Sequence, residues 1–277
     1  MTRANLVVFF TVLLIPHITI AQDMSEAEQI VASLNWSAGP GTFEVTQNAS
    51  IELPAGYDRL DPDDTRKLME LFENPPSDEE YYVGPEDQRW FAIFTYEDTG
   101  HITDNEDIDP DALLDSIRDA TKAGNAERRD RGWAEMHIVG WQYEPFYSDI
   151  TNRLSWAIMA ESDGARIVNY NTRLLGRTGV ISAVLVADPE MLSESVAEFE
   201  TLLEGFNYNA GSTYAEYREG DKLATYGLAA LVTGGAAVAV AKGMGKGLIK
   251  AIGLGVLALL AALRGRIKRA FSSKKSV

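Results

Sequence analysis

A carboxylate and an imidazole on one expected strand are the first pair of side chains in this sequence that could do chemistry. Glu135 and His137 alternate within the stretch Trp133 to Trp141, so a strand there would project both from the same face. Such a pair can act as a general acid and base, as a hydrolase requires. The alternative, which we favour, is a surface pair on the polar side of a half-buried strand.

Other catalytic signatures are missing from the sequence. It contains no cysteine, and after residue 21 the only other histidine is His101. It also lacks GxSxG, HExxH and a glycine loop with a phosphate-binding lysine, the motifs of nucleophilic, zinc and nucleotide chemistry. The sequence therefore favours a non-enzymatic protein without a cofactor, and it offers no catalytic residue beyond the Glu135 and His137 alternative.

An acidic loop from Asp104 to Asp111 raises the question of calcium, because clustered carboxylates suit that ion. The spacing does not fit a calcium loop. Ile108 stands fifth, where an oxygen ligand belongs, and Asp109 stands sixth, where the loop needs glycine. We expect Asp109 to cap the following helix and predict no metal site.

The best polar candidates for a binding surface lie in the segment NYNTRLLGRTG. They are Asn169, Asn171, Arg173 and Arg177, and strand alternation puts the first three on one face. The alternative is a structural role, in which these side chains hold neighbouring strands by hydrogen bonds, and we favour it.

Aromatic residues gather in two segments. Trp141, Tyr143, Phe146 and Tyr147 surround Pro145. This first group could lie at an interface, as aromatic side chains with polar handles often do, or pack beneath a sheet, and we favour packing. The second group comprises Phe206, Tyr208, Tyr214 and Tyr217. For it, contact with a membrane or partner and a simple connecting role stay open.

The elements that would position these residues form an α+β domain. Helices are expected at Ser25 to Leu34, from Pro62 with Asp61 as its cap, from Pro110, and after Asp188-Pro189. Apolar and alternating runs predict strands, with hairpin signals such as Ser162-Asp163-Gly164 between the later ones. An antiparallel sheet meander flanked by helices is the economical assembly. The expected strands are 43–45, 50–53, 90–96, 133–141, 154–161, 165–175 and 179–186.

Charge divides the chain into an acidic body and a basic end. Residues 1–21 have the pattern of a secretory signal peptide, with Arg3, an apolar run and a small-x-small cleavage site. The body, residues 22–222, holds 15 basic and all 41 acidic residues, a formal charge of −26, and nine basic residues follow it. Such an acidic surface argues against nucleic-acid binding.

The end of the chain has the composition of a membrane region, residues 223–263. A first pass is expected over 223–241, and a second apolar segment, 248–263, is either interfacial or a second pass. The basic tail, 264–277, favours one pass with a cytoplasmic C-terminus. Small residues every fourth position could pack this helix against itself or another membrane protein. They are Gly235, Ala239, Gly243, Gly247, Ala251 and Gly255.

Several motifs together resemble a known family. They are LPAGYDRLDPDDTRKL (53–68), ENPP (73–76), GWxxxPxY (140–147), NYNTRLLGRTG (169–179), and FNYNAGSTYAEY followed by DKLATYG (206–227). The chain resembles bacterial membrane-anchored proteins classed as a domain of unknown function. The resemblance implies export and a membrane anchor, and it supplies no catalytic residue.

These observations predict a protein of the bacterial inner membrane with a periplasmic N-terminal domain. The lipid bilayer is its first expected partner. The domain would act as an interaction or structural module of the cell envelope. The alternatives are a hydrolase-type enzyme that uses Glu135 and His137, and a sensor or transport accessory protein.

Overall fold

The computed structural model describes residues 26–104 and 106–233. The expected signal peptide, the small-residue ladder, the second apolar segment and the basic tail lie outside these residues, as does most of the expected first pass. What the sequence predicts for them stays a prediction.

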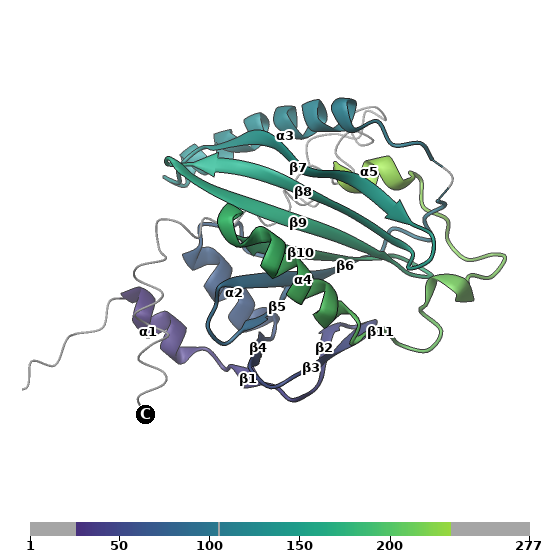
Figure 1. Cartoon of the computed structure of the whole chain (residues 1–277), viewed down its shortest axis with the longest axis horizontal. Helices are drawn as coiled ribbons and strands as arrows, with labels where there is room; N and C mark the ends of the chain where they lie inside the picture. Colours follow the sequence, from purple (N-terminus) through teal and green to yellow (C-terminus); the bar gives the residue numbers. More distant parts are fainter. Residues whose placement is uncertain (1–25, 105, 234–277) are drawn as a thin grey trace, which may run out of the picture.

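Helices separate runs of strands along the described residues (Figure 1). The helices are α1 (Glu26–Ser33), α2 (Pro62–Leu71), α3 (Pro110–Asp130), the 3-10 turn η1 (Pro189–Met191), α4 (Leu192–Leu203), the 3-10 turn η2 (Tyr214–Glu216) and α5 (Leu228–Val232). The strands are β1 (Ser37–Ala38), β2 (Gly41–Thr46), β3 (Ala49–Leu53), β4 (Tyr57–Leu60), β5 (Tyr81–Pro85), β6 (Trp90–Glu97), β7 (Met136–Ser148), β8 (Arg153–Ser162), β9 (Ala165–Leu175), β10 (Val180–Ala187) and β11 (Phe206–Tyr208).

Two antiparallel sheets organise the fold. The larger has eight strands in the order β1-β4-β5-β6-β10-β9-β8-β7, and the smaller has the order β11-β3-β2. Strands β7 to β10 follow one another as a meander, and β10 then pairs with β6, which is distant in sequence. The predicted α+β class with an antiparallel meander is confirmed.

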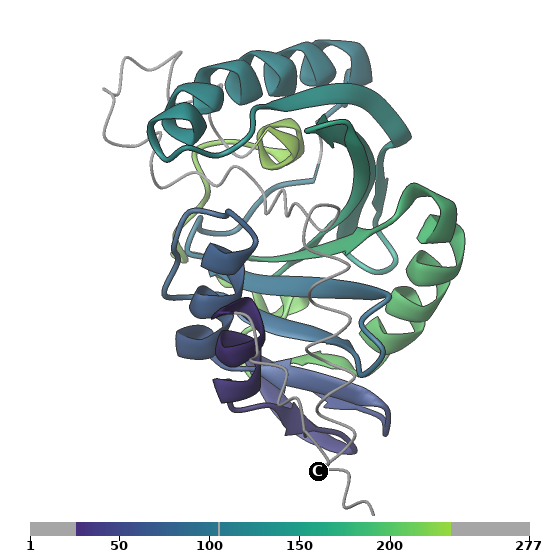
Figure 2. The same ribbon diagram turned by 90° about the vertical axis from the view of Figure 1, so that its left-hand side faces the viewer.

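Strand β10 lies in the middle of the large sheet and is buried on both faces. Ile181, Ala183 and Leu185 belong to a cluster with α4 and strands β2 and β3 of the small sheet, and we call this side the outer face. Val184 and Val186 face the opposite way, toward α1 and α2. This inner face also carries Val180, which packs in a cluster with α5 and residues of α3. In Figure 2, α4 lies on one side of the sheet while α2 and α5 lie on the other.

Side-chain caps mark the first residues of two helices, α2 and α3, where the sequence predicts them. The Asp61 side chain accepts from the Asp64 backbone N–H, and Asp109 accepts from Ala112 N–H, each at 3.2 Å. Each cap thereby satisfies a backbone donor that the first turn of a helix leaves unpaired. Pro62 and Pro110 follow the caps and need no such partner.

Strand β7 runs longer than expected and passes through Pro145. It lies at the edge of the sheet, where a proline without an N–H is tolerated. Its pairing with β8 shifts register between Ile138 and Gly140 and twice more before Phe146. These bulges twist the edge and disfavour pairing with a further strand.

Candidate functional site

The polar row of β9 lies on the inner face of the large sheet. Register pairs Arg173, Asn171 and Asn169 with Ser182, Val184 and Val186 of β10, so all six side chains project from that face. The three β9 side chains are at most 5% exposed. They therefore share a face, but that face is covered, and a binding role for them stays a prediction.

Arg173 is the most unusual member of this row. Its guanidinium lies 4.9 Å from the centre of the Trp156 ring on neighbouring β8. Its Nε and Nη1 are buried, and neither finds a hydrogen-bond acceptor among the described residues. Burial lowers the pKa of Arg173, against the opposing influence of Glu97 and Tyr226. A cation in this position costs free energy that the ring contact offsets only in part.

Arg177, the fourth candidate, lies apart from the row. In the turn after β9 it holds Asp221 through two bonds, Nε to Oδ2 at 2.7 Å and Nη2 to Oδ1 at 2.8 Å. Its Nη1 donates to the Gly211 carbonyl oxygen at 3.3 Å. This paired geometry fixes orientation as well as distance. Arg177 therefore ties the segment after β11 to the sheet.

His101 strengthens the same junction. Its ring is stacked between Tyr214 and Tyr217, with ring centres 4.4 and 4.3 Å away. Its backbone N–H donates to the Lys222 carbonyl oxygen, and its own carbonyl accepts from Ala224 N–H. The neighbouring Gly100 has φ +88°, and a Cβ there would lie 2.7 Å from the Lys222 oxygen. The close approach of the two segments thus requires glycine.

The structure gives Glu135 and His137 separate environments. Glu135 precedes β7, and its carboxylate forms an ion pair with Arg129 at 2.6 Å. His137 is exposed on the outer face, opposite Glu161 of β8. Neither side chain lines the groove between α4 and the β3–β4 connection.

The acidic loop provides contacts to neighbouring elements. Asp109 caps α3, as predicted, and Asp104 accepts from the Tyr147 hydroxyl at 3.1 Å. Glu106 accepts from the backbone N–H of Ala229 in the first turn of α5 at 3.0 Å. Within residues 26–104 and 106–233, no group of three or more histidine, aspartate or glutamate side chains could hold a metal ion.

The aromatic groups divide between core and surface. Trp141 and Tyr147 pack with the α5 cluster, as expected. Tyr143 and Phe146 are instead 43% and 69% exposed, so the expected packing is wrong for these two. Bulges between the four residues shift the alternation that the sequence alone would give.

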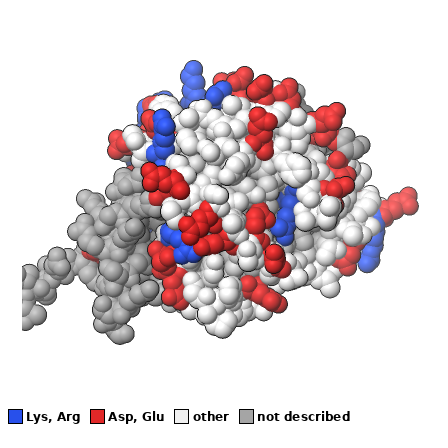
Figure 3. All heavy atoms as spheres, in the orientation of Figure 1, with Lys and Arg blue, Asp and Glu red and all other residues white. Residues whose placement is uncertain are grey.

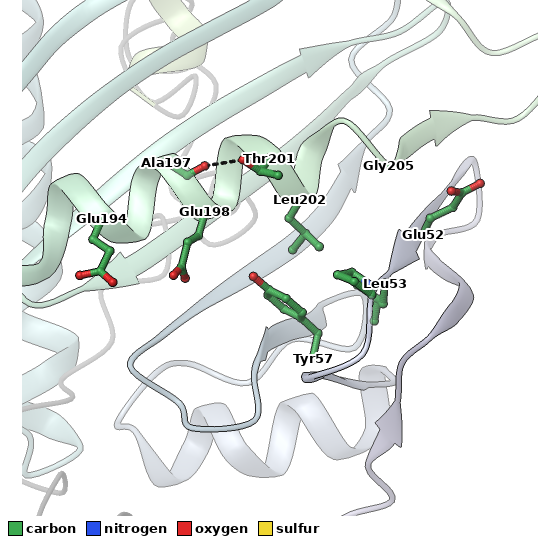
Figure 4. A pocket seen from close by; sticks show the side chains of 10 residues that line it. Glu52, Leu53, Tyr57, Glu194, Ala197, Glu198, Thr201, Leu202 and Gly205 are labelled. Carbon is green, nitrogen blue, oxygen red and sulfur yellow. Dashed lines mark hydrogen bonds between the residues drawn. The ribbon is translucent and has the colours of Figure 1, made fainter.

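A groove of about 540 Å³ opens between α4 and the β3–β4 connection (Figure 4). Leu53, Tyr57 and Leu202 give it apolar walls, and Glu52, Glu194 and Glu198 add carboxylates. Glu198 is engaged, because it accepts from the Trp90 indole N–H at 2.8 Å and pairs with Arg89. Burial, and then Glu198, raise the pKa of Tyr57. Sequence reasoning missed this groove because its two walls are distant in the chain.

Comparison with known proteins now places the chain. Residues 37–264 match the family described as "Protein of unknown function (DUF2167)". The chain belongs to this family. The description of the family assigns no activity to its members. It therefore gives no role to the groove or to the polar row of β9.

No curated protein matches this DUF2167 protein. Among solved structures, it is similar to the solution structure of cyanobacterial PsbP (CyanoP) from Synechocystis sp. PCC 6803. The TM-score is 0.36 at 10% identity, over 64% of this chain and 94% of that one.

The described part of the DUF2167 chain holds no helix that is both long and apolar enough to cross a membrane. Within the expected first pass, residues 228–232 form the short helix α5.

Replacing Arg173 with methionine should stabilise the domain. The change removes a desolvated cation and keeps an unbranched apolar stem, so the free energy of unfolding should rise by about 1–2 kcal/mol. Arg153→Met is the control, because Arg153 has acceptors in Glu200 and Leu203, and its loss should destabilise. Thermal and urea unfolding measure both effects. An Arg173→Met variant less stable than Arg153→Met would contradict this account of Arg173.

Acid should weaken the Arg177–Asp221 junction. The hydrogen bond from Arg177, followed by that from the Arg218 backbone, lowers the pKa of Asp221 from 3.8 to about 2. The folded state therefore binds fewer protons than the unfolded state in this range. The contribution of Asp221 is complete above pH about 4 and is lost as pH falls through the folded pKa.

Asp221→Asn should consequently reduce the fall in stability between pH 4 and pH 2, measured by urea unfolding at each pH. Asp98→Asn is the matched control, because Asp98 forms an exposed ion pair with Lys222 in the same region. If Asp221→Asn and the unaltered protein lost the same stability in acid, the contact between Arg177 and residue 221 would contribute equally with and without the Asp221 charge. That result would contradict the prediction.

Proposed function

We propose that this protein is a membrane-anchored interaction module of the bacterial cell envelope. Residues 1–21 would direct export of the acidic domain, 22–222, and residues 223–241 would cross the inner membrane. The segment 248–263 would follow as an interfacial helix or a second pass, with the tail 264–277 in the cytoplasm. The division between acidic body and basic end supports this arrangement.

The observation that carries the interaction role is an apolar surface along β7. Val139, Tyr143 and Phe146 of β7 and Ile150 of the following turn are exposed, Ile150 to 90%. Figure 3 shows a largely uncharged area above α4, in contrast to the charged side chains around it. Large apolar side chains exposed along one strand of a charged domain favour a protein-binding surface.

The geometry of β7 favours side-chain docking over strand addition. Pro145 removes a donor from the free edge, and three register shifts distort it. Tyr143 packs edge-on against Tyr170, with ring centres 6.4 Å apart, and Tyr170 packs in the same way against Phe199 of α4. The exposed ring is therefore supported by core contacts, as a preorganised binding residue would be.

Charge indicates the kind of partner. The body has a formal charge of −26, so an approaching acidic protein would be repelled. We expect a partner protein with an apolar patch inside a basic rim, since that combination suits both the β7 surface and the field around it.

A photo-crosslinking amino acid in place of Phe146 tests this role in intact cells. We expect it to trap one protein of defined size, and Tyr143→Ser in the same chain to lower the yield about tenfold, as a loss of ~1.4 kcal/mol would. The same amino acid in place of exposed Asp163, at the β8–β9 turn, is the control. Equal trapping at both positions, or no adduct at Phe146, would contradict the proposal.

A further inference from the structure

The short helix α5 is packed into the domain as core. Leu228, Leu231 and Val232 are at most 5% exposed. They share a cluster with Val180 of β10 and Trp156 of β8, on the inner face of the sheet. Glu106 accepts from the Ala229 N–H and so caps the first turn.

The same residues are needed for the proposed membrane span. If α5 stays in the domain, only the nine uncharged residues from Thr233 to Ala241 precede Lys242. As a helix they would extend about 14 Å, whereas the hydrocarbon core measures about 30 Å. With α5 included, Thr225 to Ala241 provides 17 uncharged residues, which reaches the lower limit of about 17 for a crossing helix.

We infer that α5 exchanges between the domain and the bilayer, and that it uncovers the inner face beside Trp156 and Val180 when it joins the membrane span. This inference rests on the proposed membrane anchor. The leucine side chains avoid water in both positions, in the core or in lipid, so the exchange does not require their hydration.

A second, independent observation concerns the surface near α5. Arg173 lies against Trp156, a member of the α5 cluster. Burial and Glu97 raise the pKa of the Tyr226 hydroxyl to about 12, and the nearby charge of Arg173 opposes that rise. Its Nε and Nη1 are buried without an acceptor among the described residues. Water admitted by the departure of α5 would hydrate this cation, which offsets part of the cost of uncovering Val180 and Trp156.

The junction before α5 marks the fixed end of the exchanging segment. Arg177 holds Asp221, and the His101 backbone bonds Lys222 and Ala224. The residues that follow reach α5 through Gly227, which has no side chain to cap the helix. The chain can therefore change direction after Ala224 while the domain stays attached.

Single cysteines in the cysteine-free full chain test the inference in lipid nanodiscs. Val180→Cys reports on the surface beneath α5. Val184→Cys is the matched control, because it lies on the same strand and face but packs with α1 and α2. Both valines are at most 2% exposed. Labelling is compared only for protein that stays in the membrane during alkaline extraction. In that protein, a water-soluble maleimide should label Val180→Cys at least about tenfold faster than Val184→Cys.

A lengthened span provides the converse test. Lys242→Leu with Lys246→Leu makes Thr233 to Ile249 an uncharged stretch of 17 residues, so that α5 can stay docked. Val180→Cys in this background should be protected to the level of Val184→Cys.

Three results would overturn the inference while the anchor stands. They are equal protection of both cysteines in the natural span, equal labelling of both, and unchanged labelling of Val180→Cys in the lengthened span. Release of the protein by alkaline extraction would instead overturn the proposed anchor, and the inference with it. The extraction step thus distinguishes the two failures.

Discussion

Burial of β10 on both faces is the constraint on which the rest of the structure depends. Its eight residues are all buried, and alternate side chains require different covers. A fully buried valine, leucine or isoleucine contributes roughly 1.5–3 kcal/mol, so an uncovered face would cost much of the stability of a domain. The outer face is covered by α4 and the small sheet, and the inner face by α1, α2 and α5.

Helices α4 and α5, which cover opposite faces of β10, differ in length and in the contacts that hold them. Helix α4 is 12 residues long, and its residue Glu198 accepts hydrogen bonds from Arg89 and Trp90. Helix α5 has only five residues and packs with Trp156, the ring against which Arg173 lies. Two buried nitrogens of Arg173 have no acceptor among the described residues. Helix α5 also belongs to the apolar stretch that we propose as the membrane span. The shorter of the two helices therefore lies next to the proposed anchor, where a membrane could act on it.

Local patterns predicted much of the fold from sequence. Asp61 and Asp109 were identifiable as caps because a cap depends on neighbours three residues away. Strands β1, β4, β5 and β11 are not predicted, because they are only two to five residues long and give too short an alternating or apolar run to be recognised. For Arg173, alternation placed the side chain with Asn169 and Asn171 but could not say which face would be covered. Leu228 to Val232 suit lipid and protein core equally, so composition alone indicated only the membrane.

Protease protection in spheroplasts of a chain with a C-terminal epitope tag tests the central claim, an exported domain on a membrane anchor, most directly. The account predicts that external protease digests the domain while the tag survives until the membrane is permeabilised. A domain that is protected in intact spheroplasts, or a tag that is digested there, would contradict it.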